Sequence, residues 1–127
     1  MNKVVHFEVP YDDKEKCKEF YHKVFDWKLQ DIPEMSYTIA HTVEVDEKQM
    51  PKEVGAINGG MYKRDAKSAK GPLIVIDVTS VDEYLKKVKK AGGKVFREKM
   101  QVGDMGWYAQ VVDTEENIIG IWQTIKK

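Results

Sequence analysis

The chain has 127 residues, of which 42% are hydrophobic, and this suits one domain with a packed core. Its 21 Lys and Arg residues balance 21 Asp and Glu residues, so its charge does not favour a nucleic-acid partner. The single cysteine, Cys17, excludes an intrachain disulfide and fits a reducing compartment. Because no apolar segment is long enough for a secretory signal or a bilayer span, we expect a cytoplasmic protein without membrane contact.

The first predicted element is a strand over residues 4–9, a short β-branched segment bounded by Pro10. Side chains alternate across a strand, so the two faces of this segment differ in character. The alternation places Val5, Phe7 and Val9 on one face and Val4, His6 and Glu8 on the other.

An amphipathic helix is predicted next, with Asp12 or Asp13 as its N-cap and its end near Asp26. Its apolar residues recur at helical spacing and form one stripe. The stripe consists of Cys17, Phe20, Tyr21, Val24 and Phe25. We expect Phe20, Tyr21, Val24 and Phe25 to cover the face of the first strand that carries Val5, Phe7 and Val9. Cys17 lies on this stripe, which favours packing over a role as a nucleophile.

Three more strands complete the first half, over residues 27–30, 37–45 and 55–62. Residues 33–35 predict a turn, and Met50 lies in a loop. The polar, basic residues 63–70 predict a solvated linker, since they include no aromatic residue that could stack on bases.

The same order of elements returns in the second half. Residues 73–78 predict a strand, and Ser80 with Glu83 forms a capping box that begins a helix. The paired glycines Gly92 and Gly93 end that helix. Strands are predicted over residues 94–102, 107–113 and 117–123, with turns at 103–106 and 114–116.

The repeated order indicates one domain made of two βαβββ modules, an α+β fold. The first module spans residues 1–62, a linker spans 63–71 and the second module spans 72–125. One helix covers only one face of a four-stranded sheet, so the other face of each sheet needs a partner. We expect two curved, mixed sheets to form a cup, which is a natural place for a small molecule.

At this level of detail the sequence resembles the vicinal-oxygen-chelate superfamily of glyoxalases, bleomycin-resistance proteins and extradiol dioxygenases. The resemblance covers almost the whole chain. It rests on residues 4–10, 18–27, 56–61, 81–85, 91–95 and 113–123. The superfamily often has Asp-Pro-x-Gly-Asn before its last strand, where this chain has Thr114 and Glu116 in place of Pro and Gly. The resemblance also implies a homodimer, which the zero net charge permits.

Metal-dependent members of that superfamily draw their ligands from four positions. Carried over by position, these fall on His6, near Asn58, near Leu73 and near Gly120. Only His6 is a good ligand, so we expect no metal ion and no other cofactor. A rearranged site of His6, Glu8 and His41, holding zinc, nickel, iron or manganese, is the alternative.

The resemblance and the broken ligand set together favour a metal-independent module that binds a small organic molecule, similar to the bleomycin-resistance members. Leu73, Val75 and Trp122 would line the cup, and His6, Glu8 and Asn58 would orient the ligand. The alternative is a glyoxalase-type lyase or isomerase, or a dioxygenase, with a divalent metal ion or with Glu8 as general base. A third reading is a cup filled by side chains in a dimeric scaffold.

Overall fold

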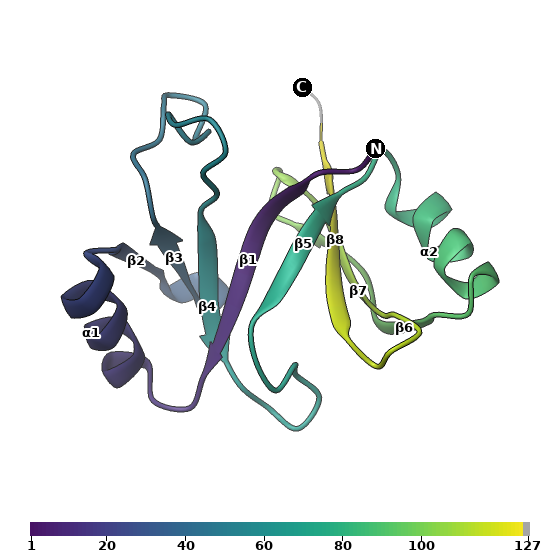
Figure 1. Cartoon of the computed structure of the whole chain (residues 1–127), viewed down its shortest axis with the longest axis horizontal. Coiled ribbons are helices and arrows are strands. Elements are labelled where there is room, and N and C mark those ends of the chain that lie inside the picture. Colours follow the sequence, from purple (N-terminus) through teal and green to yellow (C-terminus); the bar gives the residue numbers. More distant parts are fainter. Residues whose placement is uncertain (126–127) are drawn as a thin grey trace. The chain divides into compact units, whose positions relative to one another are not determined.

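The computed structural model describes residues 1–125, and the chain divides into two compact units. The first unit contains residues 6–72, and the second contains residues 1–5 together with the described chain from residue 73 onward. Each unit has the order strand, helix and three strands (Figure 1), which confirms the predicted α+β fold of two βαβββ modules. The cup between the two halves stays a prediction.

The first unit is a four-stranded sheet with one helix, in the strand order β2-β3-β4-β1. Its elements are β1 (Val4–Tyr11, which belongs to this unit from His6 onward), α1 (Lys14–Phe25), β2 (Lys28–Ile32), a short 3-10 helix η1 (Pro33–Met35), β3 (Tyr37–His41) and β4 (Gly59–Lys63). Strands β1 and β4 run parallel, while β4, β3 and β2 are antiparallel neighbours. In this register Glu8 lies beside Gly60, and Gly60 lies beside Ile39.

The core of the first unit lies between its sheet and α1. Its buried residues are Val9, Tyr11, Ala40 and Met61, and Phe7, Cys17, Tyr21, Trp27 and Leu29 pack against them. The predicted alternation of β1 is confirmed, since Phe7 and Val9 face this core. Cys17 contacts Met61 through sulfur, with 3.9 Å between Sγ and Sδ, and its partial burial raises the pKa of the thiol.

The expected cover of β1 by the whole apolar stripe of α1 is wrong. Phe20, Val24 and Phe25 are more than half exposed, and no residue of α1 is fully buried. On the opposite flank of the helix, Lys18 pairs with Asp31 of β2 at 2.9 Å. Cys17 and Tyr21 therefore face the sheet, and the residues one step further round the helix are left at its exposed flank.

Two strands of the first unit are shorter than the sequence predicts. Strand β3 ends at His41 instead of residue 45, and β4 begins at Gly59 instead of residue 55. The reason is Asn58, whose Oδ1 accepts hydrogen bonds from the backbone N–H groups of Thr42 and Val43 at 2.7 and 3.1 Å. These two donors are thereby taken from the ladder that would continue the strands.

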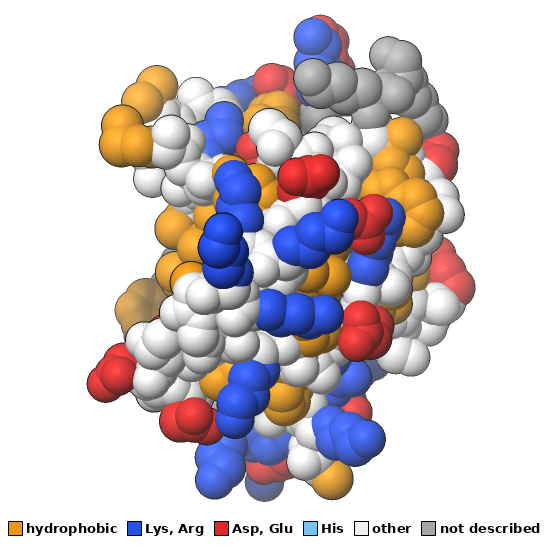
Figure 2. Space-filling model, turned by 90° about the vertical axis from the view of Figure 1, so that its right-hand side faces the viewer, with side chains coloured by type: hydrophobic (Ala, Val, Ile, Leu, Met, Phe, Trp, Pro, Cys, Tyr) orange, Lys and Arg blue, Asp and Glu red, His pale blue; other side chains and the backbone are white. Residues whose placement is uncertain are grey.

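The second unit has the strand order β5-β8-β7-β6. Its elements are β5 (Leu73–Asp77), α2 (Val81–Lys90), β6 (Lys94–Val102), β7 (Gly106–Val112) and β8 (Ile118–Thr124). Its core lies between the sheet and α2, where Val81 and Leu85 of the helix are buried with Ala109, Val111 and Ile121. The outward side of α2 is charged, and Figure 2 shows Lys and Arg side chains with interspersed acidic ones over this part of the surface.

Several local predictions about helix ends and turns are confirmed. Asp13 caps α1 by accepting from the Lys16 N–H, and Ser80 caps α2 by accepting from the Glu83 N–H. In the turn before β8, Asp113 accepts from the Glu115 and Asn117 N–H groups, which lowers the pKa of its carboxyl. No helix in residues 1–125 is both long and apolar enough to cross a bilayer.

Candidate functional site

The face of the first sheet that lies opposite α1 carries the polar residues singled out in the sequence. We call it the His6 face, and define it by His6, Glu8, Tyr37, Ile39, His41, Gly60 and Tyr62. The opposite face of the same strands points to α1. It carries the buried residues Val9, Met61, Thr38 and Ala40. Histidine, carboxylate and tyrosine groups thus share one sheet surface.

The centre of the His6 face is a contact between His6 and Tyr37. The Nε2 atom of His6 lies 2.8 Å from the Tyr37 hydroxyl oxygen, and the two rings are stacked with centroids 6.4 Å apart. Tyr37 reaches His6 by lying across Gly60, since a Cβ at position 60 would overlap its ring and hydroxyl. A glycine in the middle of β4 is therefore what allows this pair to form.

His6 is held in its neutral form by its surroundings. Burial lowers the pKa of His6 to about 4 from its usual 6.5. A neutral imidazole has one N–H and one lone pair, so the nitrogen left over from the Tyr37 contact can act as donor or acceptor, depending on the tautomer. At neutral pH the residue offers a hydrogen bond but no charge.

Glu8 follows His6 on the same face of β1 and is only 7% exposed. It sits in one row with Gly60 on the neighbouring strand β4 and, one strand further along, with Ile39 on β3. A carboxyl group so placed can accept a hydrogen bond from a ligand or take a proton from one.

The side chain of Asn58, which the sequence predicts to orient a ligand, makes hydrogen bonds within the first unit. Its Oδ1 accepts from Thr42 N, Thr42 Oγ1 and Val43 N, and so ties the two ends of the long connection between β3 and β4. Its Nδ2 atom is buried and has no hydrogen-bond partner. The carbonyl end of Asn58 serves the fold, and only the amino end could serve a ligand.

Replacing Asn58 with Ala should free the residue 42–58 connection at its base. We expect a loss of about 2 kcal/mol in the free energy of unfolding, because several buried hydrogen bonds to one oxygen disappear. Hydrogen exchange at the Thr42 and Val43 amides should accelerate in Asn58→Ala. The exposed Glu53→Ala in the same connection is the control, and equal exchange rates in the two variants would contradict the assigned role.

In the second unit, the residues predicted to contact a ligand lie on the face opposite α2. We call this the Gln110 face, and define it by Leu73, Val75, Tyr108, Gln110, Gly120 and Trp122. Leu73 and Val75 are buried, at 4% and 1% exposure. Trp122 donates from Nε1 to Thr124 Oγ1 at 3.0 Å and lies against Gly106. Trp107 instead packs against the core on the α2 side.

The Gln110 face repeats one detail of the His6 face. Tyr108 lies across Gly120 as Tyr37 lies across Gly60, and its hydroxyl meets the Gln110 Nε2 at 2.9 Å. Gln110 is 4% exposed, and its Oε1 atom is buried without a hydrogen-bond partner. A buried carbonyl oxygen of this kind usually finds a partner in water or a ligand.

Sequence reasoning missed Tyr37 and Gln110. Both lie on strands that were correctly predicted, but their positions beside His6 and Gly120 depend on cross-strand register. One signal was available in the sequence. Tyr37 and Tyr108 each lie on a strand that pairs with a glycine-containing strand.

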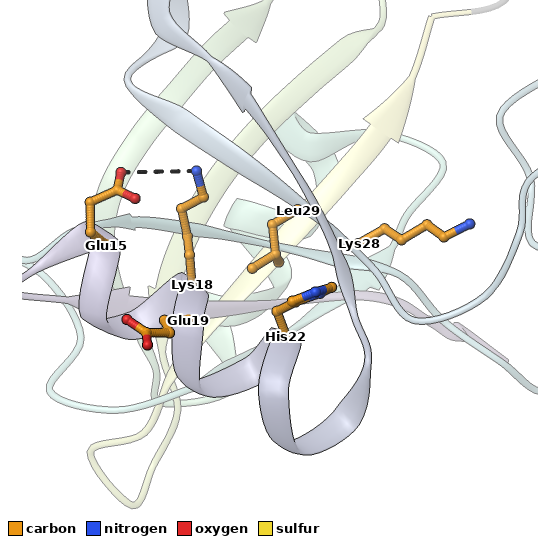
Figure 3. A pocket seen from close by; sticks show the side chains of 6 residues that line it. All are labelled: Glu15, Lys18, Glu19, His22, Lys28 and Leu29. Atoms are coloured by element: carbon orange, nitrogen blue, oxygen red, sulfur yellow. Dashed lines mark ion pairs between the residues drawn. The ribbon is translucent and has the colours of Figure 1, made fainter.

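The surface along α1 has an open groove of about 480 Å³, shown in Figure 3. It is lined by Glu15, Lys18, Glu19, His22, Lys28 and Leu29. Most of its charges are already paired, since Lys18 contacts Glu15 and Asp31 while Glu19 pairs with Lys23. In Figure 3 the His22 ring and the Glu19 carboxylate point different ways, so these two side chains do not converge on one point.

The resemblance to the superfamily raises the question of a resident metal ion, but the side chains present do not fit one. Leu73 and Gly120 offer no ligand atom, and Asn58 Oδ1 is taken up by backbone donors. Within residues 1–125, no three His, Cys, Asp or Glu side chains are grouped so as to hold a metal ion. The rearranged set of His6, Glu8 and His41 is therefore not assembled.

Comparison with known proteins agrees with this geometry. Residues 3–42 match the family model described as bleomycin resistance protein-like N-terminal. A solved glyoxalase/bleomycin resistance protein/dioxygenase superfamily member from Vibrio splendidus 12B01 has 11% identity and a TM-score of 0.64, covering 98% of this chain and 100% of that one. The chain has the fold of the glyoxalase/bleomycin resistance/dioxygenase superfamily. The predicted resemblance is thereby confirmed.

Other structures with the superfamily fold extend over nearly the same length. A hypothetical protein from Bacillus halodurans C-125 has 17% identity and a TM-score of 0.65, covering 99% of this chain and 96% of that one. Methylmalonyl-CoA epimerase from Mycobacterium tuberculosis has 12% identity and a TM-score of 0.61, covering 97% of this chain and 88% of that one. No curated protein matches the sequence. At these identities the superfamily likeness establishes the fold.

Proposed function

We propose that this chain binds a small organic molecule on the His6 face, without a metal ion. The observation that carries the proposal is the part-buried contact between a neutral His6 and Tyr37, next to the buried Glu8. Such a surface combines aromatic area with a few placed polar groups, which is the usual make-up of a small-molecule site. Of the four positions that supply metal ligands in the superfamily, only His6 carries a good ligand in this chain. This supports the proposal of a site without a metal ion.

The polar groups on the His6 face favour a ligand with at least one hydrogen-bond donor. Glu8 offers carboxyl oxygens, and His6 offers a single uncharged nitrogen. Tyr37 and Ile39 add a flat, largely apolar surface on β3. The ligand that fits is a neutral or cationic molecule with an aromatic or aliphatic body. Contact of Leu73, Val75 and Trp122 with the ligand stays a prediction.

Likeness to other proteins lends this proposal support of a general kind. One structure with the same fold is methylmalonyl-CoA epimerase in complex with methylmalonyl-CoA, at 13% identity, so the fold accommodates a small organic ligand there. The match of residues 3–42 to a bleomycin resistance protein-like model covers β1, α1, β2 and β3, which include His6, Glu8 and Tyr37.

The experiment is a screen of neutral and cationic aromatic compounds by NMR on isotope-labelled protein, with and without EDTA. At least one compound should shift the backbone amides of Glu8, Ile39 and Gly60, and EDTA should leave the shifts unchanged. Glu8→Gln and Tyr37→Phe should each weaken that compound about tenfold, the loss of one buried polar contact. The exposed Glu53→Gln is the matched control. Binding that EDTA abolishes, or no compound that shifts these amides, would count against the proposal.

An enzyme that uses Glu8 as a general base is the second candidate. It is favoured by the burial of Glu8, which is 7% exposed and lies on the His6 face. For any bound compound with an acidic C–H bond, such an enzyme would exchange that hydrogen with deuterium from D₂O, and Glu8→Gln would stop the exchange. Binding without exchange would leave the binding module as the function.

A further inference from the structure

Helix α2 leaves part of its sheet uncovered, and an apolar groove lies beside the helix. The groove is open, has a volume of about 660 Å³ and runs between α2, the residues before β1 and the strands β5 and β8. We call it the α2 groove, and define it by Asn2, Ile76, Tyr84, Val88, Asp113 and Ile119. All of these residues belong to the second unit. The volume falls within the range of about 300–1,000 Å³ that small-molecule sites occupy.

The groove exists because α2 lies over β6, β7 and β8 more than over β5. Val81 and Leu85 of the helix pack on Ile121 of β8. Ile76 is the neighbour of Ile121 on β5, but it is only partly buried, and Ile74 before it is 42% exposed. These side chains lie on the face of the sheet opposite the Gln110 face, because residues alternate along a strand. The floor of the groove is therefore apolar surface that the helix does not cover.

The two ends of the α2 groove lie near opposite ends of β8. Asn2 donates from Nδ2 to the Asp77 carbonyl at 3.0 Å, and Asp77 pairs with Trp122 late in β8. Asp113 instead follows β7, where that strand pairs with Ile118 at the start of β8. Residues 118 and 122 are about 13 Å apart along a strand. An extended alkyl chain of similar length, such as that of decanoate, fits along the floor.

The two ends of the α2 groove also differ in charge. The Tyr84 hydroxyl donates to Asn2 Oδ1 at 3.2 Å, and the Lys87 ammonium lies 4.4 Å from the centroid of the Tyr84 ring. The same half of α2 carries three more lysines, and Figure 2 shows lysine side chains with apolar ones between them on this face. The other end carries the Asp113 carboxylate. An anionic group is thus attracted to the Tyr84 end and repelled at the Asp113 end.

We propose that the α2 groove binds a free fatty acid, a single alkyl chain with an anionic head group. The alkyl chain lies on Ile76 and Ile119, and the carboxylate lies at the Tyr84 end beside Lys87. The floor supplies most of the binding free energy, because alkyl surface is removed from water there. A free chain is favoured over a bilayer, because the apolar surface is the floor of a groove between helix and sheet and does not protrude.

An NMR titration of isotope-labelled protein with decanoate tests the proposal. Decanoate should shift the backbone amides of Ile76, Val88 and Ile119, and it should bind about fourfold to tenfold more tightly than octanoate, since two more methylenes leave water. Decyltrimethylammonium has the same chain length and the opposite charge, and it should bind about fivefold more weakly than decanoate. These amides differ from those that report on the His6 face, so the two proposals can fail separately.

Two pairs of exposed variants test the head group and the chain. Lys87→Glu should weaken decanoate about fivefold, whereas Lys16→Glu makes the same change of charge in the first unit and should leave binding unchanged. Ala91→Trp puts a large ring into the Asp113 end of the groove and should remove the gain from octanoate to decanoate. Ala66→Trp, at an exposed position in the first unit, should keep that gain. Circular dichroism should confirm that all four variants stay folded.

A chain that binds neither carboxylate, or that binds decanoate with shifts only on the His6 face, would overturn the proposal. Equal binding of decanoate and decyltrimethylammonium would also overturn it, since the anionic head group is part of it. So would an Ala91→Trp variant that binds decanoate as tightly as Ala66→Trp does. Binding to anionic phospholipid vesicles without binding to monomeric decanoate would make a bilayer the occupant and contradict the proposal.

Discussion

Lowering the pH from 7 to 4 should reduce the free energy of unfolding by about 3 kcal/mol through His6 alone. Burial lowers the pKa of His6 from 6.5 to about 4 in the folded chain. Between these values the unfolded chain binds a proton at His6 and the folded chain does not. Stability is therefore complete above pH 6.5 and falls as the pH drops towards 4.

The carboxyl groups act in a separate range of pH. Asp31, Asp46 and Asp113 have lowered pKa values through hydrogen bonds from Lys18, from the Met50 N–H and from Asn117, respectively. Their contributions are present above the carboxyl pKa of the unfolded chain, and they are lost only at pH values below about 4. The interval from pH 6.5 to about 4.5 thus reports mainly on histidine.

Urea unfolding at a series of pH values measures this effect. His6→Gln should flatten the curve of stability against pH between 6.5 and 4.5, and Val54→Ser, an exposed change without a titratable group, should leave its slope unchanged. A slope of equal size in His6→Gln would show that another group is responsible and would remove the claim that His6 is neutral in the fold.

The sequence was a good guide wherever the determining physics is local. Alternation along one strand was enough to put His6 and Glu8 on one face, away from Val9. The caps at Asp13 and Ser80 depend on contacts three residues along the chain, and both are confirmed. Patterns of this kind need no knowledge of which strands are neighbours.

The sequence was a poor guide to contacts that depend on cross-strand register or on hydrogen bonds between residues far apart in the chain. The contact of His6 with Tyr37 spans 31 residues and needs the β3–β4–β1 register. The early end of β3 depends on Asn58, a residue 16 positions away from Thr42. The exposure of Phe20 and Val24 depends on how α1 is rotated over its sheet, which the spacing of apolar residues along the helix does not determine.

Gly59→Ala should destabilise the first unit by about 3 kcal/mol, at the upper end of what a single added methyl costs in a packed interior. A Cβ at position 59 would lie 2.5 Å from the carbonyl oxygen of Phe7 and 2.5 Å from its ring atom Cε2. Phe7 and Gly59 are register partners in the parallel pair of β1 and β4. The ring has little room to yield because it packs on Trp27 at 5.3 Å.

The neighbouring glycine offers an internal comparison. A Cβ at Gly60 would meet only side-chain atoms, those of Tyr37, and that side chain can rotate away. Gly60→Ala should therefore cost less, about 1 kcal/mol, chiefly through the lost hydrogen bond between Tyr37 and His6. It should also weaken ligand binding on the His6 face, whereas Gly59→Ala acts from the opposite side of the sheet.

Gly71→Ala is the matched control, since a Cβ there would meet no atom within 4 Å. Urea unfolding of the three variants should give the order Gly59→Ala, Gly60→Ala, Gly71→Ala from the largest loss to the smallest. A Gly59→Ala variant as stable as Gly71→Ala would mean that β1 and β4 are not held as closely as this register requires. The placement of His6 and Glu8 beside Tyr37 depends on the same pairing, so the stability of this one variant also tests the geometry of the candidate site.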